Sequence, residues 1–230
     1  MLKLFDLAGA DDNVRFSPYC WRVKLALTHK RLPVETIPWR FTEKDRIAQS
    51  GQGRVPVLVD GDKWIADSWT IAEYLEDTYP DRPSLFGGGA GRALSRFYVG
   101  WADTILQPAM ARLIVRDILD RLHAKDRAYF RQSREERYGK TLEEVVADRE
   151  KSLPAFRAKL APLRTVFHAQ PFLGGAVPLH ADYIVFGSFQ WARATSAFEL
   201  LASDDVVHAW RERMLDLYGG LARKAPAEAA

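Results

Sequence analysis

Cysteine is almost absent from this sequence, since Cys20 is the only one among 230 residues. A single cysteine excludes a framework of disulfides within the chain and is typical of proteins in a reducing compartment. We therefore expect a cytoplasmic location. We also expect no metal cofactor.

Long apolar runs are missing as well. The longest uncharged apolar stretch, Tyr183 to Ala192, is well short of the roughly 20 residues that a membrane-spanning helix needs. Near the N-terminus, Asp6, Asp11 and Asp12 interrupt the apolar stretch that a signal peptide requires. These two absences predict a soluble protein that has no membrane partner.

An excess of one charge is the third feature that the sequence lacks. Lys and Arg together number 33 and Asp and Glu 30, so the net charge is +3. Both signs are scattered along the chain without a block of like charges, and nothing in this balance favours nucleic acid as a partner. The length allows one or two domains, because domains usually hold about 100 to 200 residues.

The first 80 residues alternate strand and helix signals. Residues 2–7 and 34–39 predict strands, and between them Ser17-Pro18 marks a helix start, with serine as the N-cap and proline at the first helical position. Two strands joined by a helix predict a right-handed βαβ unit. We further expect a short helix near residues 43–49, a hairpin where Asp-Gly joins two apolar runs at residues 60–62, and a helix from residue 67 or 68 to 79.

The rest of the chain carries only helix signals. Residues 80–91, PDRPSLFGGGAG, are rich in proline and glycine and predict a linker. Beyond them apolar residues recur at helical spacing, as in Leu94, Phe97, Tyr98 and Trp101. We therefore predict an α/β domain over residues 1–82, a linker at 83–91 and an all-helical domain over 92–230.

Three features of the first domain could each be purely structural. Ser17 as an N-cap is common and stabilises a helix by about 1 kcal/mol. Val55-Pro56 precedes the predicted hairpin, where proline at the start of a strand is tolerated. Asp67 or Ser68 could merely cap the third helix, although a helix N-terminus also offers free N–H groups and a positive partial charge to a ligand.

In this order and spacing, and followed by a helical domain, the three features resemble the glutathione transferase family over the whole chain. The segments SPYCWRVKLALTHK, RVPVLVDG and DSWTIAEYLEDTYPDRPSLF look most like the bacterial β-etherases and the fungal etherase-like glutathione transferases. Residues 125–150 look like the same subgroup, although we expect most of their Arg and Glu side chains on a solvated helix face. The resemblance implies a thioredoxin-like first domain that binds glutathione as co-substrate and a helical second domain that binds an electrophile.

The resemblance also implies roles for single residues. Ser17 would be the catalytic hydroxyl of a serine-type enzyme. Val55, just before a cis-Pro56, would pair its backbone with the cysteinyl part of glutathione. Asp67 and Ser68 would bind the γ-glutamyl end.

The remaining candidates surround these residues. Arg54 and, as a weaker candidate, Arg40 occupy positions suited to the glycyl carboxylate of glutathione, and without glutathione both would be partly buried surface residues. Tyr19, Tyr98 and Trp101 could line a pocket for the electrophile at the domain interface. For Tyr98 and Trp101, helical spacing of aromatics fits the core equally well.

The chemistry of such a site follows from the thiol. A cysteine thiol titrates near pH 8.5, and a helix N-terminus can lower this pKa to roughly 3.5 to 7.5. The Ser17 hydroxyl, located at a helix start, would stabilise the thiolate of glutathione by donating a hydrogen bond. Cys20, three residues into the same helix, is expected to be a small buried hydrophobe.

We therefore predict a glutathione transferase whose co-substrate thiolate attacks a small aromatic electrophile. If the subgroup resemblance extends to activity, the reaction is displacement of an aryl ether next to a carbonyl. The alternatives are a non-catalytic glutathione-binding or ligand-carrying module, and a glutathione-dependent isomerase or thiol reductase. A homodimer is expected from the family.

The second domain departs from the family pattern at one point. Leu179 stands where a capping Ser or Thr is usual, three residues before Asp182, so this helix could start less firmly unless His180 compensates. Trp191 and Trp210 are expected in the core.

Overall fold

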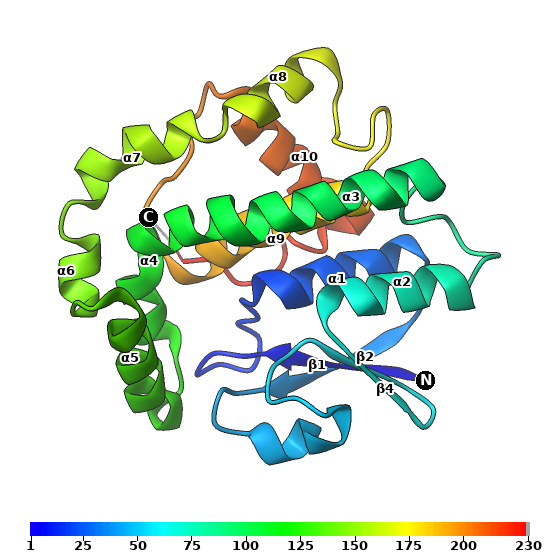
Figure 1. The fold of residues 1–230 in the computed structure, drawn as a ribbon, viewed down its shortest axis with the longest axis horizontal. Coiled ribbons are helices and arrows are strands. Elements are labelled where there is room, and N and C mark those ends of the chain that lie inside the picture. Colours follow the sequence, from blue (N-terminus) through cyan, green and yellow to red (C-terminus); the bar gives the residue numbers. More distant parts are fainter. Residues whose placement is uncertain (229–230) are drawn as a thin grey trace.

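Strands and helices alternate in the first part of the computed structural model, which describes residues 1–228 (Figure 1). Every element predicted for this part is present, and the predicted short helix is a 3₁₀ helix. In chain order the elements are β1 (Leu2–Leu7), α1 (Pro18–His29), β2 (Val34–Trp39), η1 (Lys44–Ser50), β3 (Val57–Asp60), β4 (Lys63–Ala66) and α2 (Ser68–Thr78).

The four strands form one mixed sheet in the order β2-β1-β3-β4. β1 and β2 are parallel and are joined through α1, as the βαβ pattern predicts, while β3 runs antiparallel to β1 and β4. Leu7 pairs with Trp39, Phe5 with Val57, and Val57 with Ala66. The end of β1, the start of β3 and the end of β4 therefore meet at one end of the sheet.

Every regular element from residue 89 to residue 220 is a helix, which confirms the all-helical prediction. The predicted linker ends too late, however, because α3 already begins at Gly89; Gly88, with φ of 114°, turns the chain directly into it. The helices are α3 (Gly89–Trp101), the π-helical segment η2 (Ala102–Leu106), α4 (Gln107–Arg121), α5 (Ala124–Tyr138), α6 (Leu142–Val146), α7 (Arg149–Ala158), α8 (Ala161–Ala169), α9 (His180–Thr195) and α10 (Val206–Gly220).

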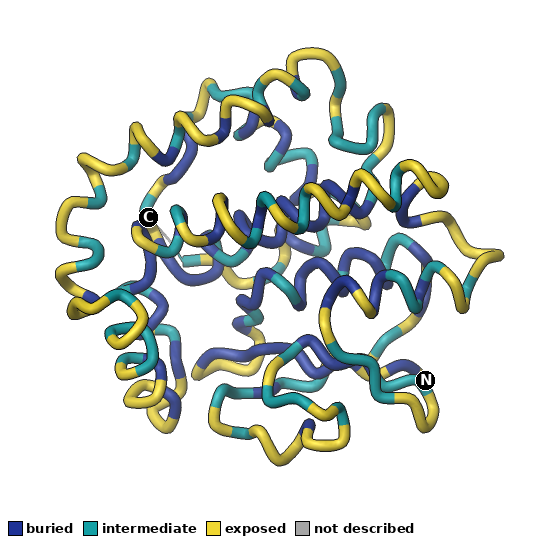
Figure 2. Tube along the Cα trace, in the orientation of Figure 1, coloured by how far each residue is buried: buried dark blue, intermediate teal, exposed yellow. Residues whose placement is uncertain are grey.

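The helix α9 is the centre of the molecule. In Figure 1, α1 and α2 cover one face of the sheet, and α3 and α9 lie beyond them. The trace in Figure 2 is buried along most of α1 and α9. At Gly187 an added Cβ would lie 2.4 Å from the carbonyl oxygen of Pro18, so glycine lets α9 pack directly on the first turn of α1.

The start of α9 is firmer than the sequence predicts. Leu179 has no side-chain acceptor, but the Asp182 carboxylate accepts hydrogen bonds from the backbone N–H groups of Leu173, Gly174 and Leu179 at 2.8, 2.9 and 3.1 Å. It also accepts one from Trp210 Nε1 at 2.9 Å. Of the two possibilities that the sequence left open, a less firm start is not observed, and the compensation comes from Asp182 itself, because this buried acid ties together the helix start, the preceding loop and α10.

A second buried acid joins the two parts of the chain. The Asp126 carboxylate, on the first turn of α5, accepts hydrogen bonds from the backbone N–H groups of Phe41 and Thr42 at 3.0 and 3.1 Å and from the Thr42 hydroxyl at 2.7 Å. This contact holds α5 next to the segment that follows β2. One wall of the helical domain thus faces the end of the sheet described above.

Candidate functional site

Ser17 lies at the end of the sheet where the strand ends meet. The loop after β1 folds back on that strand, because Ala8 pairs with Arg15 and the Phe16 N–H donates to the Leu7 carbonyl at 3.3 Å. The helix α1 therefore begins beside the end of β1, with Ser17 as its N-cap. The helix start predicted from Ser17-Pro18 is confirmed.

The Ser17 side chain is buried and keeps a donor available. Its Oγ accepts a hydrogen bond from the backbone N–H of Cys20 at 3.3 Å. A hydroxyl that accepts in this way can still donate its own hydrogen. Together with the positive end of the α1 dipole, this donor suits an anion bound at the start of the helix.

A space for such an anion exists. A cavity of about 460 Å³ lies next to Ser17, between the end of the sheet and the helices α4, α5 and α9. Four predicted site residues line it: Ser17, Tyr19, Arg54 and Val55. The Val55–Pro56 peptide bond is cis, and Pro56 is buried behind Val55.

The two candidate arginines differ in what they already contact. Arg54 is exposed at the cavity, and within residues 1–228 its guanidinium forms no ion pair or hydrogen bond. Arg40 lies outside the cavity lining. Its guanidinium donates to the carbonyls of Gly9 and Ala10 at 3.1 and 3.3 Å and pairs with Asp12 at 2.6 Å. Arg40 thus holds the loop after β1.

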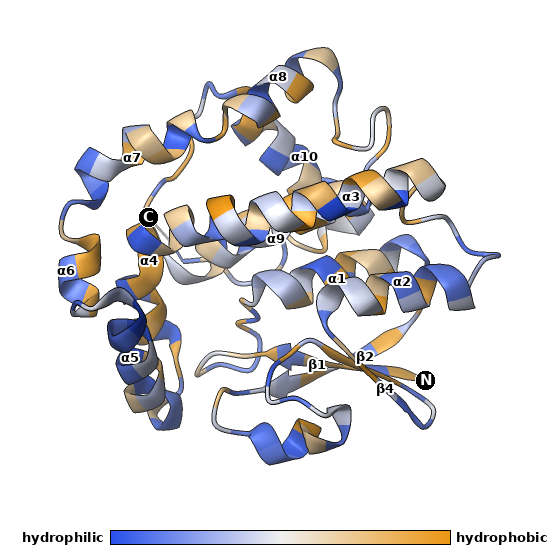
Figure 3. Cartoon of the chain, in the orientation of Figure 1, coloured by the Kyte–Doolittle hydropathy of each residue, from blue (hydrophilic) through white to orange (hydrophobic). Residues whose placement is uncertain are grey.

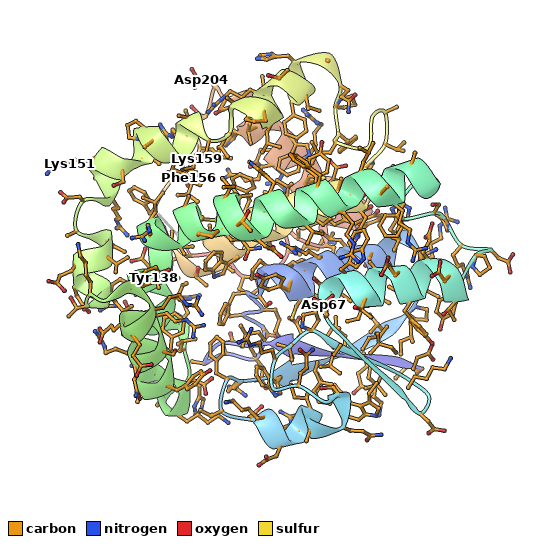
Figure 4. All side chains as sticks on the ribbon, viewed as in Figure 1. Asp67, Tyr138, Lys151, Phe156, Lys159 and Asp204 are labelled. Carbon is orange, nitrogen blue, oxygen red and sulfur yellow. The ribbon has the colours of Figure 1, made fainter. Side chains whose placement is uncertain are left out.

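Asp67 and Ser68 follow β4 at the same end of the sheet as Val55. Asp67 is the N-cap of α2, and its Oδ1 accepts hydrogen bonds from the N–H groups of Trp69 and Thr70, each at 3.0 Å. Its φ of 75° is rare for a residue with a side chain and is found mainly where surrounding structure enforces it, often at ligand sites. Neither residue lines the cavity itself, but both follow Ala66, which pairs with Val57 two residues after Val55. In the view of Figure 4, the start of α1 lies between the labelled residues Asp67 and Tyr138.

The opposite wall of the cavity comes from α5 and was missed by sequence reasoning. Phe130, Arg134 and Tyr138 follow one another at intervals of four residues and Arg137 lies three residues after Arg134, so all four share one side of the helix and line the cavity. The expectation that most Arg and Glu side chains of this segment lie on a solvated face did not foresee that Arg134 and Arg137 line the cavity. The signal that could have found it is the alternation of arginine with aromatic residues at helical spacing.

Comparison with known families covers both parts of the chain. A model described as "Glutathione S-transferase, C-terminal domain" matches residues 93–219, more than half of the chain. A model described as "Glutathione S-transferase, N-terminal domain" matches residues 13–83. The chain belongs to the glutathione S-transferase family. The fold is accordingly a thioredoxin-like α/β domain followed by a helical domain, as the resemblance implies.

Individual curated relatives match only in part. "Glutathione S-transferase Z2" of Arabidopsis thaliana is 33% identical over 111 residues, which are 46% of this chain and 50% of that protein. "Glutathione S-transferase DHAR2" of the same plant is 39% identical over 79 residues, 34% of this chain and 37% of that protein. The matched region spans at most about half the length of these relatives.

Solved structures of the family match over nearly the whole chain. The glutathione transferase GSTFuA3 of Phanerochaete chrysosporium has a TM-score of 0.76 at 25% identity, covering 95% of this chain and 92% of that one. A glutathione S-transferase of Ceriporiopsis subvermispora, solved in complex with glutathione, has a TM-score of 0.77 at 22% identity, covering 97% and 94%. The second likeness is one of fold alone.

Within this glutathione S-transferase fold, the aromatic candidates divide between the cavity and the core. Tyr98 and Trp101 pack partly buried against the core from α3 and do not line the cavity. Trp191 of α9, expected in the core, does line it, because α9 packs across the start of α1. Trp210 is fully buried, as predicted. Burial raises the pKa of Tyr19, and the Asp103 carboxylate acts in the same direction.

A second cavity lies apart from the predicted site residues. A cavity of about 570 Å³ between α4, α7 and the segment after α9 contains none of the predicted site residues. Within residues 1–228, no group of three or more His, Cys, Asp or Glu side chains is placed to hold a metal ion. None of the helices in that range combines the length and the apolar character needed to cross a membrane.

Proposed function

We propose that this glutathione S-transferase family member is a serine-type glutathione transferase in which Ser17 activates the thiol of glutathione. The observation that carries the proposal is the buried Ser17 hydroxyl at the start of α1, which keeps a hydrogen to donate and borders the cavity at the end of the sheet. The cap of α1 uses only the oxygen of this hydroxyl, so its hydrogen is left for a ligand in the cavity.

The residues around Ser17 fit a tripeptide with two carboxylates and one ammonium group. We assign the free edge of Val55 to the cysteinyl backbone and Arg54 to the glycyl carboxylate. At the other end, Asp67 Oδ1 is occupied by the cap of α2, which leaves Oδ2 for the ammonium group. The buried Ser68 at the helix start offers its N–H to the γ-glutamyl carboxylate.

In this arrangement Ser17 acts by stabilising the thiolate rather than as a base. The hydrogen bond from its hydroxyl and the positive end of α1 favour the anion. If they lower the pKa of the bound thiol from about 8.5 to about 6.5, most of this thiol is anionic at neutral pH. The thiolate forms a C–S bond to the electrophilic carbon, and the leaving group departs with the electron pair of the bond that breaks. Where the electrophilic carbon lies next to a carbonyl and the leaving group is an aryl oxide, the reaction is the ether cleavage suggested by the subgroup resemblance.

The test is replacement of Ser17 by alanine. We expect kcat/KM for formation of a glutathione thioether, detected by mass spectrometry, to fall on the order of 10²-fold, and the pKa of the bound thiol, followed by thiolate absorbance, to rise towards 8.5. Ser17→Thr, which keeps a hydroxyl, is the matched control and should retain part of the activity. Thioether formation at the wild-type rate in Ser17→Ala would contradict the proposal.

We also propose that the protein is a homodimer that uses the outer face of α3. Leu94 and Phe97 on this face are 67% and 68% exposed, and Figure 3 shows apolar residues on the side of α3 turned to the viewer. Large exposed apolar side chains grouped on one face are typical of an interface. Phe97→Glu should convert a dimer, measured by light scattering after size exclusion, to a monomer; a wild-type monomer would exclude the proposal.

A further inference from the structure

The cavity next to Ser17 has an uneven charge. Its walls carry three guanidinium groups, from Arg54, Arg134 and Arg137, and within residues 1–228 no Asp or Glu lines it. Over the whole chain basic and acidic residues nearly balance. The cavity is therefore locally cationic against a nearly neutral molecule.

Two of these arginines lie on α5, and the acids of that helix face other partners. Asp126 is bound to the segment after β2. Glu135 accepts from Arg131 at 2.7 Å, and Glu136 accepts from the Gln132 side chain at 2.9 Å. The helix thus turns its carboxylates away from the cavity and the guanidinium groups of Arg134 and Arg137 towards it.

The cations in the cavity are not neutralised by the protein. Arg134 donates to the Ser133 hydroxyl at 2.8 Å, and its guanidinium lies over the rings of Phe130 and Phe41, at 4.5 and 5.3 Å from their centroids. Burial lowers the pKa of Arg134, and the charge of Arg137 acts in the same direction. Within residues 1–228, Arg137 has no ion pair or hydrogen bond and is exposed at the cavity. Two neighbouring guanidinium groups that have no acidic partner in the protein favour the binding of an anion.

Glutathione alone does not use all of this charge. Its γ-glutamyl carboxylate is assigned to the start of α2 and its glycyl carboxylate to Arg54, on the wall that carries Val55. Arg134 and Arg137 lie on the other wall, among the aromatic rings of Phe130 and Tyr138. This second wall therefore offers apolar ring surfaces with two guanidinium groups between them.

We propose that the electrophile is an aromatic carboxylate, whose ring packs among the aromatic side chains of α5 and whose carboxylate pairs with Arg134 and Arg137. This inference rests on the proposed function, and it names the substrate class. Guanidinium groups bind carboxylates through paired hydrogen bonds that fix orientation as well as affinity. The same contact holds the electrophilic carbon at a set distance from Ser17.

A matched pair of probes tests the role of the charge. In 4-chloro-3,5-dinitrobenzoate the thiolate forms a C–S bond at the carbon that carries chlorine, the C–Cl bond breaks, and chloride leaves with its electron pair. The methyl ester of the same compound undergoes the same substitution but carries no charge. The two thioether products made beforehand, one acid and one ester, give a binding assay that does not depend on turnover.

We expect calorimetry to show that the wild-type protein binds the acid product at least tenfold more tightly than the ester product, and kinetics to show the same preference in kcat/KM. Arg137→Gln and Arg134→Gln should each reduce this preference at least threefold. The control Lys140→Gln removes one exposed positive charge just beyond α5 and should leave the preference unchanged. Arg134 packs on Phe41, so replacing it also changes the packing of the fold. Arg137 is exposed, and Arg137→Gln therefore tests the charge without this effect.

Three results would overturn the inference. In the first, the wild-type protein binds the ester product as tightly as the acid product. In the second, the arginine variants weaken both products equally and raise KM for glutathione, which would assign the arginines to glutathione. In the third, Lys140→Gln reduces the preference as much as Arg137→Gln. If neither probe is turned over but the acid product still binds more tightly in an Arg137-dependent way, the carboxylate contact is supported without the reaction, which separates a failure of the proposed function from a failure of the contact.

Discussion

Ser17 and Cys20 lie about one helical turn apart, but their positions give their side chains opposite chemical roles. Ser17 is at the open start of α1 and borders the cavity. Cys20 is fully buried, with its Sγ 4.0 Å from the carbonyl oxygen of Phe5. Burial raises the pKa of the Cys20 thiol strongly, and the nearby Asp6 carboxylate acts in the same direction. A buried thiol of this kind is neither accessible nor anionic at neutral pH.

We therefore expect Cys20→Ala to leave kcat/KM for thioether formation within about twofold of wild type, with a loss of folding free energy of about 1 kcal/mol from the smaller side chain. Enzyme kinetics and urea unfolding measure the two effects. Loss of activity in Cys20→Ala, with activity retained in Ser17→Ala, would instead support the thiol reductase alternative.

Among the elements, α9 does most to position the site. It packs against α1, α3 and α4, and Gly187 allows the closest approach, to Pro18 at the first turn of α1. The four hydrogen bonds to Asp182 hold its start. Displacement of α9 would move Ser17 and the Trp191 wall of the cavity together, so the stability of this helix start and the geometry of the site are coupled.

We expect Asp182→Ala to lower the free energy of unfolding by roughly 3 to 5 kcal/mol, because it leaves buried N–H donors without partners. The control is Asp148→Ala, which removes an exposed acid whose one ion pair, to Lys151, is also at the surface. Urea denaturation of both variants measures the difference. Equal stability of the two variants would show that the Asp182 network contributes nothing.

For the whole molecule, stability depends on groups buried where the two domains meet. His180, at the start of α9, is buried among the rings of Trp69, Phe86 and Tyr183. Burial lowers its pKa to about 3, and the charge of Arg22 acts in the same direction. Burial also lowers the pKa of His29. Both imidazoles are therefore neutral in the folded protein at neutral pH.

A histidine whose folded pKa is depressed binds a proton more readily in the unfolded chain. Its contribution to stability is complete above the unfolded pKa of about 6.5 and is lost as the pH falls towards the folded value. Between about pH 6.5 and 5 we expect His180 to lower the free energy of unfolding by up to about 1.4 kcal/mol per pH unit.

The variant His180→Phe should flatten this dependence and leave only the part that comes from the partly buried His29. Urea denaturation at several pH values measures the slope. The matched control is His168→Gln, which changes an exposed histidine on α8 and should leave the slope as in wild type. A slope unchanged in His180→Phe would show that His180 does not titrate on unfolding.

Local signals in the sequence predicted most of the first domain and only the class of the second. Ser17-Pro18 and the Asp-Gly turn act over a few residues, so the helix start and the hairpin could be recognised without tertiary contacts. The strength of the α9 start could not, because Trp210 and the loop before Leu179 meet Asp182 only in the folded chain. Helical spacing likewise cannot tell which apolar or charged face of a helix meets a cavity.

The sequence by itself determined that Ser17 caps a helix after the first strand, that Val55-Pro56 and Asp67-Ser68 flank a hairpin, and that helices follow. These are consequences of backbone conformation and capping, which depend on near neighbours. Only the tertiary structure decided that Trp191, Arg134 and Arg137 join Ser17 at one cavity while Tyr98, Trp101 and Arg40 do not. The physical reason is that strand register and helix packing bring together residues far apart in the sequence, and no local pattern contains that information.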